Sequence, residues 1–195
     1  MSTAEELLRL AGRQLTRFLY RDLIYVAGGI LVLTVPIAGH GVLGRLVAGP
    51  WWLLVVAALA AYGAGFLASE IGVTIGAFRM FPARGAFVAS EINHVLQRAR
   101  ATIARREDEM LYADRLDFLK FLSAVFGSSA AVACILLQLY TFFGELKLTG
   151  FARAMASLSL TLAVVIMCVR NRRAALVEGR IVERWNESAD TVGRV

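Results

Sequence analysis

Glu70 is the ionisable residue best placed to do chemistry, because apolar sequence lies on both sides of it. The charge-free run before it ends at Ser69, and apolar character continues from Ile71 to Phe78. An ionised side chain at the bilayer centre costs roughly 2.5–3.5 kcal/mol by insertion scales, so such a residue is usually functional or paired. Glu70 could therefore line an ion path or accept a proton. It could equally lie at the membrane interface, hydrogen-bonded to water or to Arg79.

The other titratable and sulfur side chains indicate no metal centre and no cofactor. His40 and His94 are expected on opposite sides of a membrane, so they cannot share a metal within one subunit. Arginines flank the acidic run 107–109, which we interpret as part of a solvated helix surface. Cys134 and Cys168 lie inside apolar runs, where a cysteine is typically a small buried hydrophobe. Their number and spacing predict no disulfide framework.

Small residues recur at helical spacing along the second apolar run and predict close helix packing. Such stripes let helices approach each other in lipid, where apolar surface alone does not drive association. The contact could lie within one subunit or between subunits. In the third apolar run, Gln138 is a candidate donor for an interhelical hydrogen bond. The residues of the stripe are Ala57, Ala61, Gly65, Ser69, Gly72 and Gly76.

The long apolar runs of the sequence predict an all-α, polytopic membrane protein with four transmembrane helices. Hydrophobic residues make up 58% of the chain, above the 45–50% or so of a soluble domain. About 20 residues at 1.5 Å each cross the hydrocarbon core. We expect a first transmembrane hairpin at 23–78, a second at 121–169, and cytoplasmic segments at 1–22, 79–120 and 170–195.

The cytoplasmic segments are expected to be helical. Residues 1–22 carry an arginine at every fourth position from Arg9 to Arg21, opposite an apolar face, which is typical of an amphipathic helix. Such a helix could lie in the headgroup layer or pack on the protein's own loop. The tail is expected to continue as a helix to about Trp185.

The middle segment, 79–120, offers a candidate partner-binding face. Helix is predicted from about Phe87 onward, with Ile92, Val95 and Ile103 on one side. This apolar face is too narrow to form a core of its own, so we expect it to bury against something else.

The distribution of positive charge predicts the orientation of the chain. Of 21 lysines and arginines, only Arg45, Lys147 and Arg153 fall on the short turns expected outside. The positive-inside rule then places both termini in the cytoplasm. The net charge of +6 favours anionic headgroups as a partner. Nucleic acid is not expected, since no basic segment is interleaved with exposed aromatics. The dominance of arginine over lysine indicates a GC-rich bacterial genome, hence the cell inner membrane.

Three classes of function fit these features. The first is a non-enzymatic membrane subunit that anchors, senses or signals through its cytoplasmic helices, in an oligomer or with a soluble partner. The alternative is a small oligomeric channel or transporter with Glu70 facing the pore. A membrane-embedded enzyme is the third, and it is disfavoured because the sequence shows no nucleophile–base pair and no metal cluster.

Overall fold

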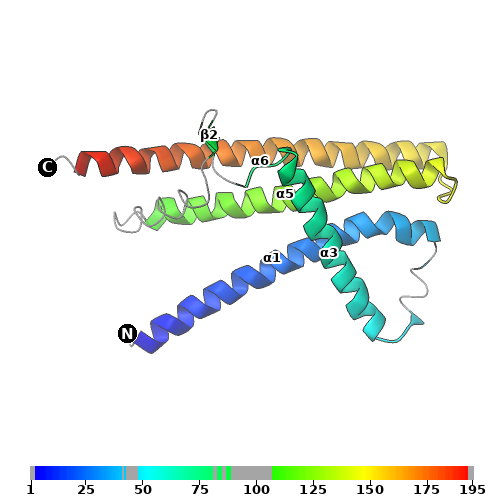
Figure 1. Cartoon of the computed structure of the whole chain (residues 1–195), viewed down its shortest axis with the longest axis horizontal. Coiled ribbons are helices and arrows are strands. Elements are labelled where there is room, and N and C mark those ends of the chain that lie inside the picture. The colour runs from blue at the N-terminus through cyan, green and yellow to red at the C-terminus, as the bar shows by residue number, and fades with distance from the viewer. Residues whose placement is uncertain are drawn as a thin grey trace. The chain divides into compact units, whose positions relative to one another are not determined.

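A computed structural model of the chain describes the backbone of residues 3–40, 42, 48–80, 83–84, 87–88 and 107–192, and the side chains of 19–40, 42, 48–80 and 108–184. The fold is all-α, as predicted (Figure 1). Its long elements are α1 (Thr3–His40), α3 (Trp52–Thr74), α5 (Glu107–Phe142) and α6 (Gly150–Val192). A two-residue antiparallel pairing joins β1 (Ala83–Arg84) to β2 (Phe87–Val88).

Each of the four helices is long and apolar enough to cross a membrane, which confirms that part of the prediction. The candidate spans contain 22, 23, 35 and 35 residues, against the roughly 20 that a bilayer requires. They are Leu19–His40, Trp52–Thr74, Asp108–Phe142 and Gly150–Arg184.

The distribution of side chains also fits lipid rather than water. Large apolar side chains lie on the surface of every helix; Ile30, Leu59, Ile135 and Leu158 are each more than half exposed. The buried face of α5 carries mainly small residues instead, including Ala124 and several serines. Small interior residues permit close helix contact, while large apolar ones face the acyl chains. Together with the four spans, this arrangement indicates a multi-pass membrane protein.

Glycines in the left-handed conformation end two of the helices. Gly76 has a φ of 72° and Gly144 a φ of 74°, values that a residue with a Cβ rarely adopts. After each glycine the next amide donates to a carbonyl five residues back: Ala77 to Gly72 and Glu145 to Tyr140, both at 3.0 Å. These bonds satisfy carbonyls that the helix leaves unpaired, as in a Schellman cap.

The boundaries of several helices differ from the sequence prediction. The helix that begins in the 1–22 segment continues without a break into the first span. The last helix continues past Trp185 to Val192. The prediction of helix from Phe87 was wrong at its start, because Phe87 and Val88 pair with β1. An aromatic and a β-branched residue close to Pro82 and Gly85 suit a short strand better than a helix.

The chain forms two compact units, and several helices contribute to both. The first comprises Met1–Ser69 and Ser129–Thr161, and the second comprises Glu70–Ser128 and Leu162–Val195.

In the first unit, α1 and α3 cross with their backbones nearly touching (Figure 1). A Cβ added to Gly29 would lie 1.5 Å from the carbonyl oxygen of Ala61, and one on Gly65 would lie 2.0 Å from that of Tyr25. The Tyr25 ring is buried beside this crossing and contacts Tyr62 edge-on at 5.5 Å. Only glycine fits at these two positions.

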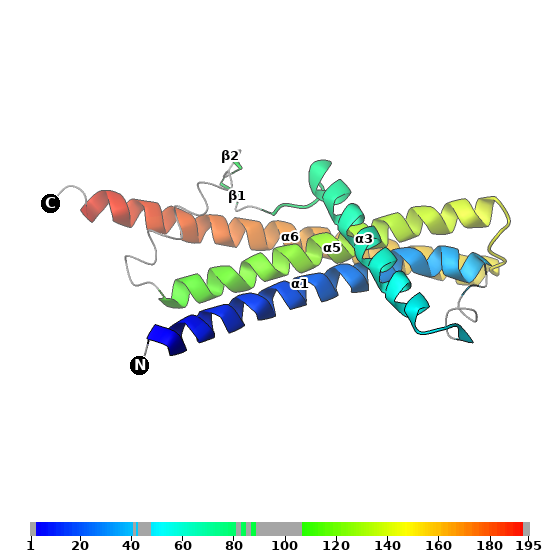
Figure 2. The same ribbon diagram turned by 60° about the horizontal axis from the view of Figure 1, so that its bottom comes forward.

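In the second unit, α5 and α6 lie side by side (Figure 2). Their contact holds a small apolar core, against which Met110 and Val177 are partly buried. The core consists of Ala113, Leu116, Ala174, Ile181 and Val182.

Candidate functional site

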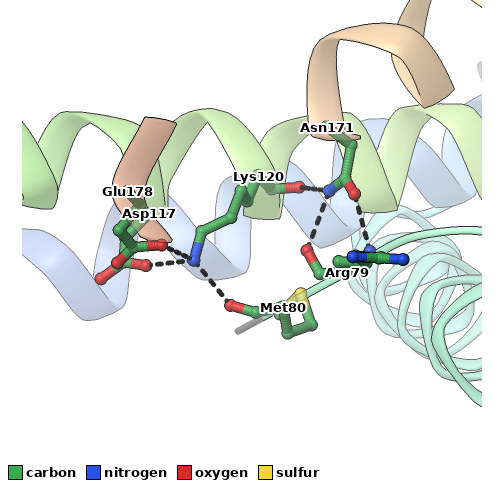
Figure 3. Close-up of polar contacts among 6 residues, drawn as sticks. All are labelled: Arg79, Met80, Asp117, Lys120, Asn171 and Glu178. Carbon is green, nitrogen blue, oxygen red and sulfur yellow. Dashed lines mark hydrogen bonds and ion pairs between the residues drawn. The ribbon is translucent and has the colours of Figure 1, made fainter. Parts of the chain in front are cut away.

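The second unit contains a buried ammonium group, that of Lys120, whose side chain is only 1% exposed. Lys120 Nζ forms an ion pair with the carboxylate of Glu178, a second with Asp117 Oδ1 at 2.7 Å, and a hydrogen bond to the Met80 carbonyl oxygen at 2.8 Å (Figure 3). An ammonium has three protons to donate. Each therefore has an acceptor, as a buried charge requires.

Three separate segments of the chain build this cluster. Asp117 and Lys120 lie three residues apart on α5, which places them on one face of that helix. Glu178 reaches them from α6 and is itself fully buried. The Met80 carbonyl comes from the segment that follows α3.

Asn171 adds three hydrogen bonds between the same three segments of the chain (Figure 3). Its Oδ1 accepts from the backbone amide of Arg79 at 2.6 Å. Its Nδ2 donates to the backbone carbonyls of Arg79 and Lys120, both at 3.0 Å. A fully buried asparagine on α6 thus bonds to both other segments. We call Asp117, Lys120, Asn171, Glu178 and the backbone of residues 79–80 the polar clasp.

The polar clasp is suited to holding helices together. Every proton of the Lys120 ammonium is already engaged within the chain. No three His, Cys, Asp or Glu side chains converge as a metal site within the described residues.

The first unit has a polar contact between α5 and α6. Gln138 Nε2 donates to Ser157 Oγ at 2.6 Å, which confirms the predicted interhelical hydrogen bond. Gln138 Oε1 accepts from Arg153, at 2.7 Å from Nη2 and 3.3 Å from Nε. The amide therefore gives the guanidinium of Arg153 a polar partner close to the short turn after α5.

His40 has neighbours from the same end of the first unit. Its Nε2 lies 3.4 Å from Tyr140 Oη and 3.8 Å from Glu145 Oε2. The side chains of His40 and Glu145 are about half exposed, so this group lies at the surface. His94 lies outside the described residues.

Glu70 is exposed on the surface of α3. The hydrogen bond or ion pair to Arg79 that we considered is not formed among the side chains described. The Arg79 backbone bonds instead to Asn171. Glu70 is not part of the polar clasp.

The small-residue stripe has several environments. Ala61 and Gly65 contact α1 within the chain, and Ala57 is half-buried. Gly72 lies against Ser128, whose Oγ is 1.9 Å from where a Cβ would be, and Ser69 is buried. Gly76 is surrounded by open space and caps α3. The proposed partner face, Ile92, Val95 and Ile103, lies outside the described residues.

Sequence reasoning did not identify the polar clasp. Lys120 is one of only two lysines in an arginine-rich chain, which is a weak indication of a special role. Asn171 stands among three arginines and Glu178 within a charged tail, so each looks like an ordinary surface residue.

Comparison with protein families, with curated proteins and with solved structures gave no match. The fold and the site define the class as a multi-pass membrane protein, with four candidate spans and a buried ionic clasp between helices.

Proposed function

We propose that the chain is a non-enzymatic membrane subunit that anchors, senses or signals through helices extending from its spans into the cytoplasm. It would act in an oligomer or with a soluble partner. We call residues 107–120 of α5 and 170–192 of α6, which lie outside the charge-free runs, the extensions. The observation that carries this proposal is the polar clasp, which joins the two extensions to each other and to residues 79–80 after α3.

The lengths of α5 and α6 support an extension of considerable size. Their 36 and 43 residues correspond to about 54 and 64 Å at 1.5 Å per residue. A bilayer core accounts for about 30 Å. Each helix would therefore continue beyond the membrane without a break, which suits a helix that relays a signal between its span and its extension.

The extension also offers apolar side chains to a partner. Leu111, Tyr112 and Phe118 of α5 are between 46% and 61% exposed. They lie on the charged portion of the helix, before the charge-free run that starts at Phe121. In this proposal the membrane covers the charge-free run, and apolar side chains exposed beyond it favour a protein contact.

The orientation belongs to this proposal. We place both termini on the cytoplasmic side of a bacterial inner membrane. The extensions of α5 and α6 then lie in the cytoplasm, on the side that holds most basic residues. The described part outside lipid is then largely cytoplasmic, where a soluble partner would be met.

Affinity capture from native membranes, with quantitative identification of the captured proteins, tests the proposal. The double variant Leu111→Ser, Phe118→Ser should lose a cytoplasmic partner that the wild-type chain retains. The control variant Arg115→Ala, which alters an exposed side chain on the same stretch of α5, should retain the partner. Capture of the same proteins by all three forms would contradict the proposal.

A channel or transporter is the second candidate, and the exposure of Glu70 favours it. A carboxylate on the surface of a candidate span is costly when it faces lipid. An oligomer with Glu70 toward a water-filled path would remove that cost. Ion flux into liposomes should then fall sharply in Glu70→Gln, with expression and oligomeric state unchanged. Flux indifferent to this change would exclude a pore role for Glu70.

A further inference from the structure

An apolar groove of about 450 Å³ lies between α5 and α6 in the second unit. Leu116 and Leu119 line it from α5, and Val165, Ile166 and Val169 line it from α6. The three α6 side chains are each about half exposed. The groove therefore opens on the outer surface of the two helices.

Two arginines line the same groove at the point where the span ends. Val169 is the last residue of the charge-free run in α6, and Arg170 follows it directly. Arg173 lies one turn further along and also lines the groove. Residues three apart share a helix face, so both guanidinium groups can approach one anion.

Neither of these arginines is neutralised within the described part of the chain. Both side chains are exposed, and no ion pair joins either to a described carboxylate. The groove lining itself contains no Asp or Glu. The groove therefore combines apolar walls with two positive charges, which lie between Val169 on one side and Ala174 and Val177 on the other.

We propose that this groove binds one anionic phospholipid. Its acyl chains lie along Val165, Ile166 and Val169, and its phosphate accepts hydrogen bonds from Arg170 and Arg173. From Val165 to Arg173, the order of apolar and cationic groups along α6 matches the order of acyl chains and headgroup along a lipid. Guanidinium groups bind phosphate oxygens through paired, charge-assisted hydrogen bonds. This site requires no protein partner and goes beyond the function proposed above.

Arg172 provides a matched control on the same helix. It is exposed and adjacent to Arg173, but it does not line the groove. Loss of either arginine removes one positive charge at almost the same depth. Diffuse attraction to anionic lipid therefore changes equally in the two variants, and only a built site distinguishes them.

Titration of the full-length protein in detergent micelles with phosphatidylglycerol, read by native mass spectrometry, tests the site. One lipid should bind per chain, more tightly than phosphatidylcholine of the same chain length. Arg173→Ala should weaken binding about tenfold, the loss expected for one charge-assisted hydrogen bond. Arg172→Ala should leave the affinity within about threefold of wild type.

Four outcomes would overturn the proposal. Equal losses in the two variants would mean diffuse attraction, and equal affinity for phosphatidylcholine would mean apolar binding alone. Displacement of the lipid by glycerol phosphate at comparable concentration would make this a site for free phosphate. A dimer that excludes lipid would assign the groove to a second copy of the chain.

Discussion

Lys120 on α5 and Glu178 on α6 form an ion pair in which both side chains are buried, 1% and 0% exposed respectively. Asp117 and the Met80 carbonyl complete the surroundings of the ammonium. A buried pair gains little relative to an apolar contact, but loss of one partner leaves an uncompensated charge. The pair therefore makes the junction of three segments sensitive to single substitutions.

Lys120→Met should destabilise the second unit by about 3–5 kcal/mol, because Glu178 then remains buried without the Lys120 ammonium. Thermal unfolding in detergent, followed by circular dichroism, measures the loss. Adding Glu178→Leu should restore a substantial part of it, since both charges are then gone. Wild-type stability in the single variant would show that the pair does not hold the helices.

Asn171→Ala should loosen the attachment of residues 79–80 to α5 and α6, although Lys120 still holds the Met80 carbonyl. The change removes three hydrogen bonds, and each buried backbone group left unpaired costs roughly 1–3 kcal/mol. Hydrogen exchange at Arg79 and Met80 should accelerate at least tenfold. The neighbouring Arg172→Ala should leave exchange unchanged. Equal protection in the two variants would argue against an asparagine-mediated attachment.

Gly65→Ala should weaken the crossing of α1 and α3, because its Cβ would meet the Tyr25 carbonyl oxygen at 2.0 Å. Gly63 is the matched control, since a Cβ there meets nothing within 4 Å. Gly63→Ala should be neutral or stabilising by up to about 1 kcal/mol through helix propensity. Comparing the two melting temperatures checks this, and similar values would contradict the close approach.

Self-association of the chain stays a prediction, and Gly65 is a poor position at which to test it. A larger residue there disturbs contacts inside the chain before it affects any contact between chains. Half-buried Ala57 is a better choice on the same helix. Ala57→Leu should reduce the crosslinked oligomer in mild detergent if the stripe joins subunits, and leave it unchanged if it does not.

Topology can be measured with single cysteines in a chain whose Cys134 and Cys168 are replaced by serine. A membrane-impermeant maleimide should label a cysteine at Thr149 in intact cells. A cysteine at Ser188 should react only after permeabilisation. Labelling of the Ser188 position in intact cells would refute the cytoplasmic placement of the C-terminus.

The spans could be predicted from the sequence because an absence of charge over some 20 residues has one physical explanation. The bond from Gln138 was also predictable, since an amide in lipid needs a partner. Lys120 was not, because a lysine next to an apolar run resembles one that snorkels to the interface. Its burial depends on residues 79–80, and no local sequence pattern predicts that they contact Lys120. Gly76 lies four residues after Gly72, as the stripe pattern requires, yet its positive φ shows that it caps the helix instead.

Site-specific photocrosslinking in native membranes tests most directly whether the α5 extension contacts a partner. A photoreactive residue at Leu111 or Phe118 should form an adduct with a soluble protein. The same residue at Leu158, which is also exposed but lies inside the charge-free run of α6 that ends at Val169, should form no adduct with a soluble protein. Protein adducts at Leu158 alone, or no adduct with another protein at Leu111 and Phe118, would contradict a function exerted through the α5–α6 extension.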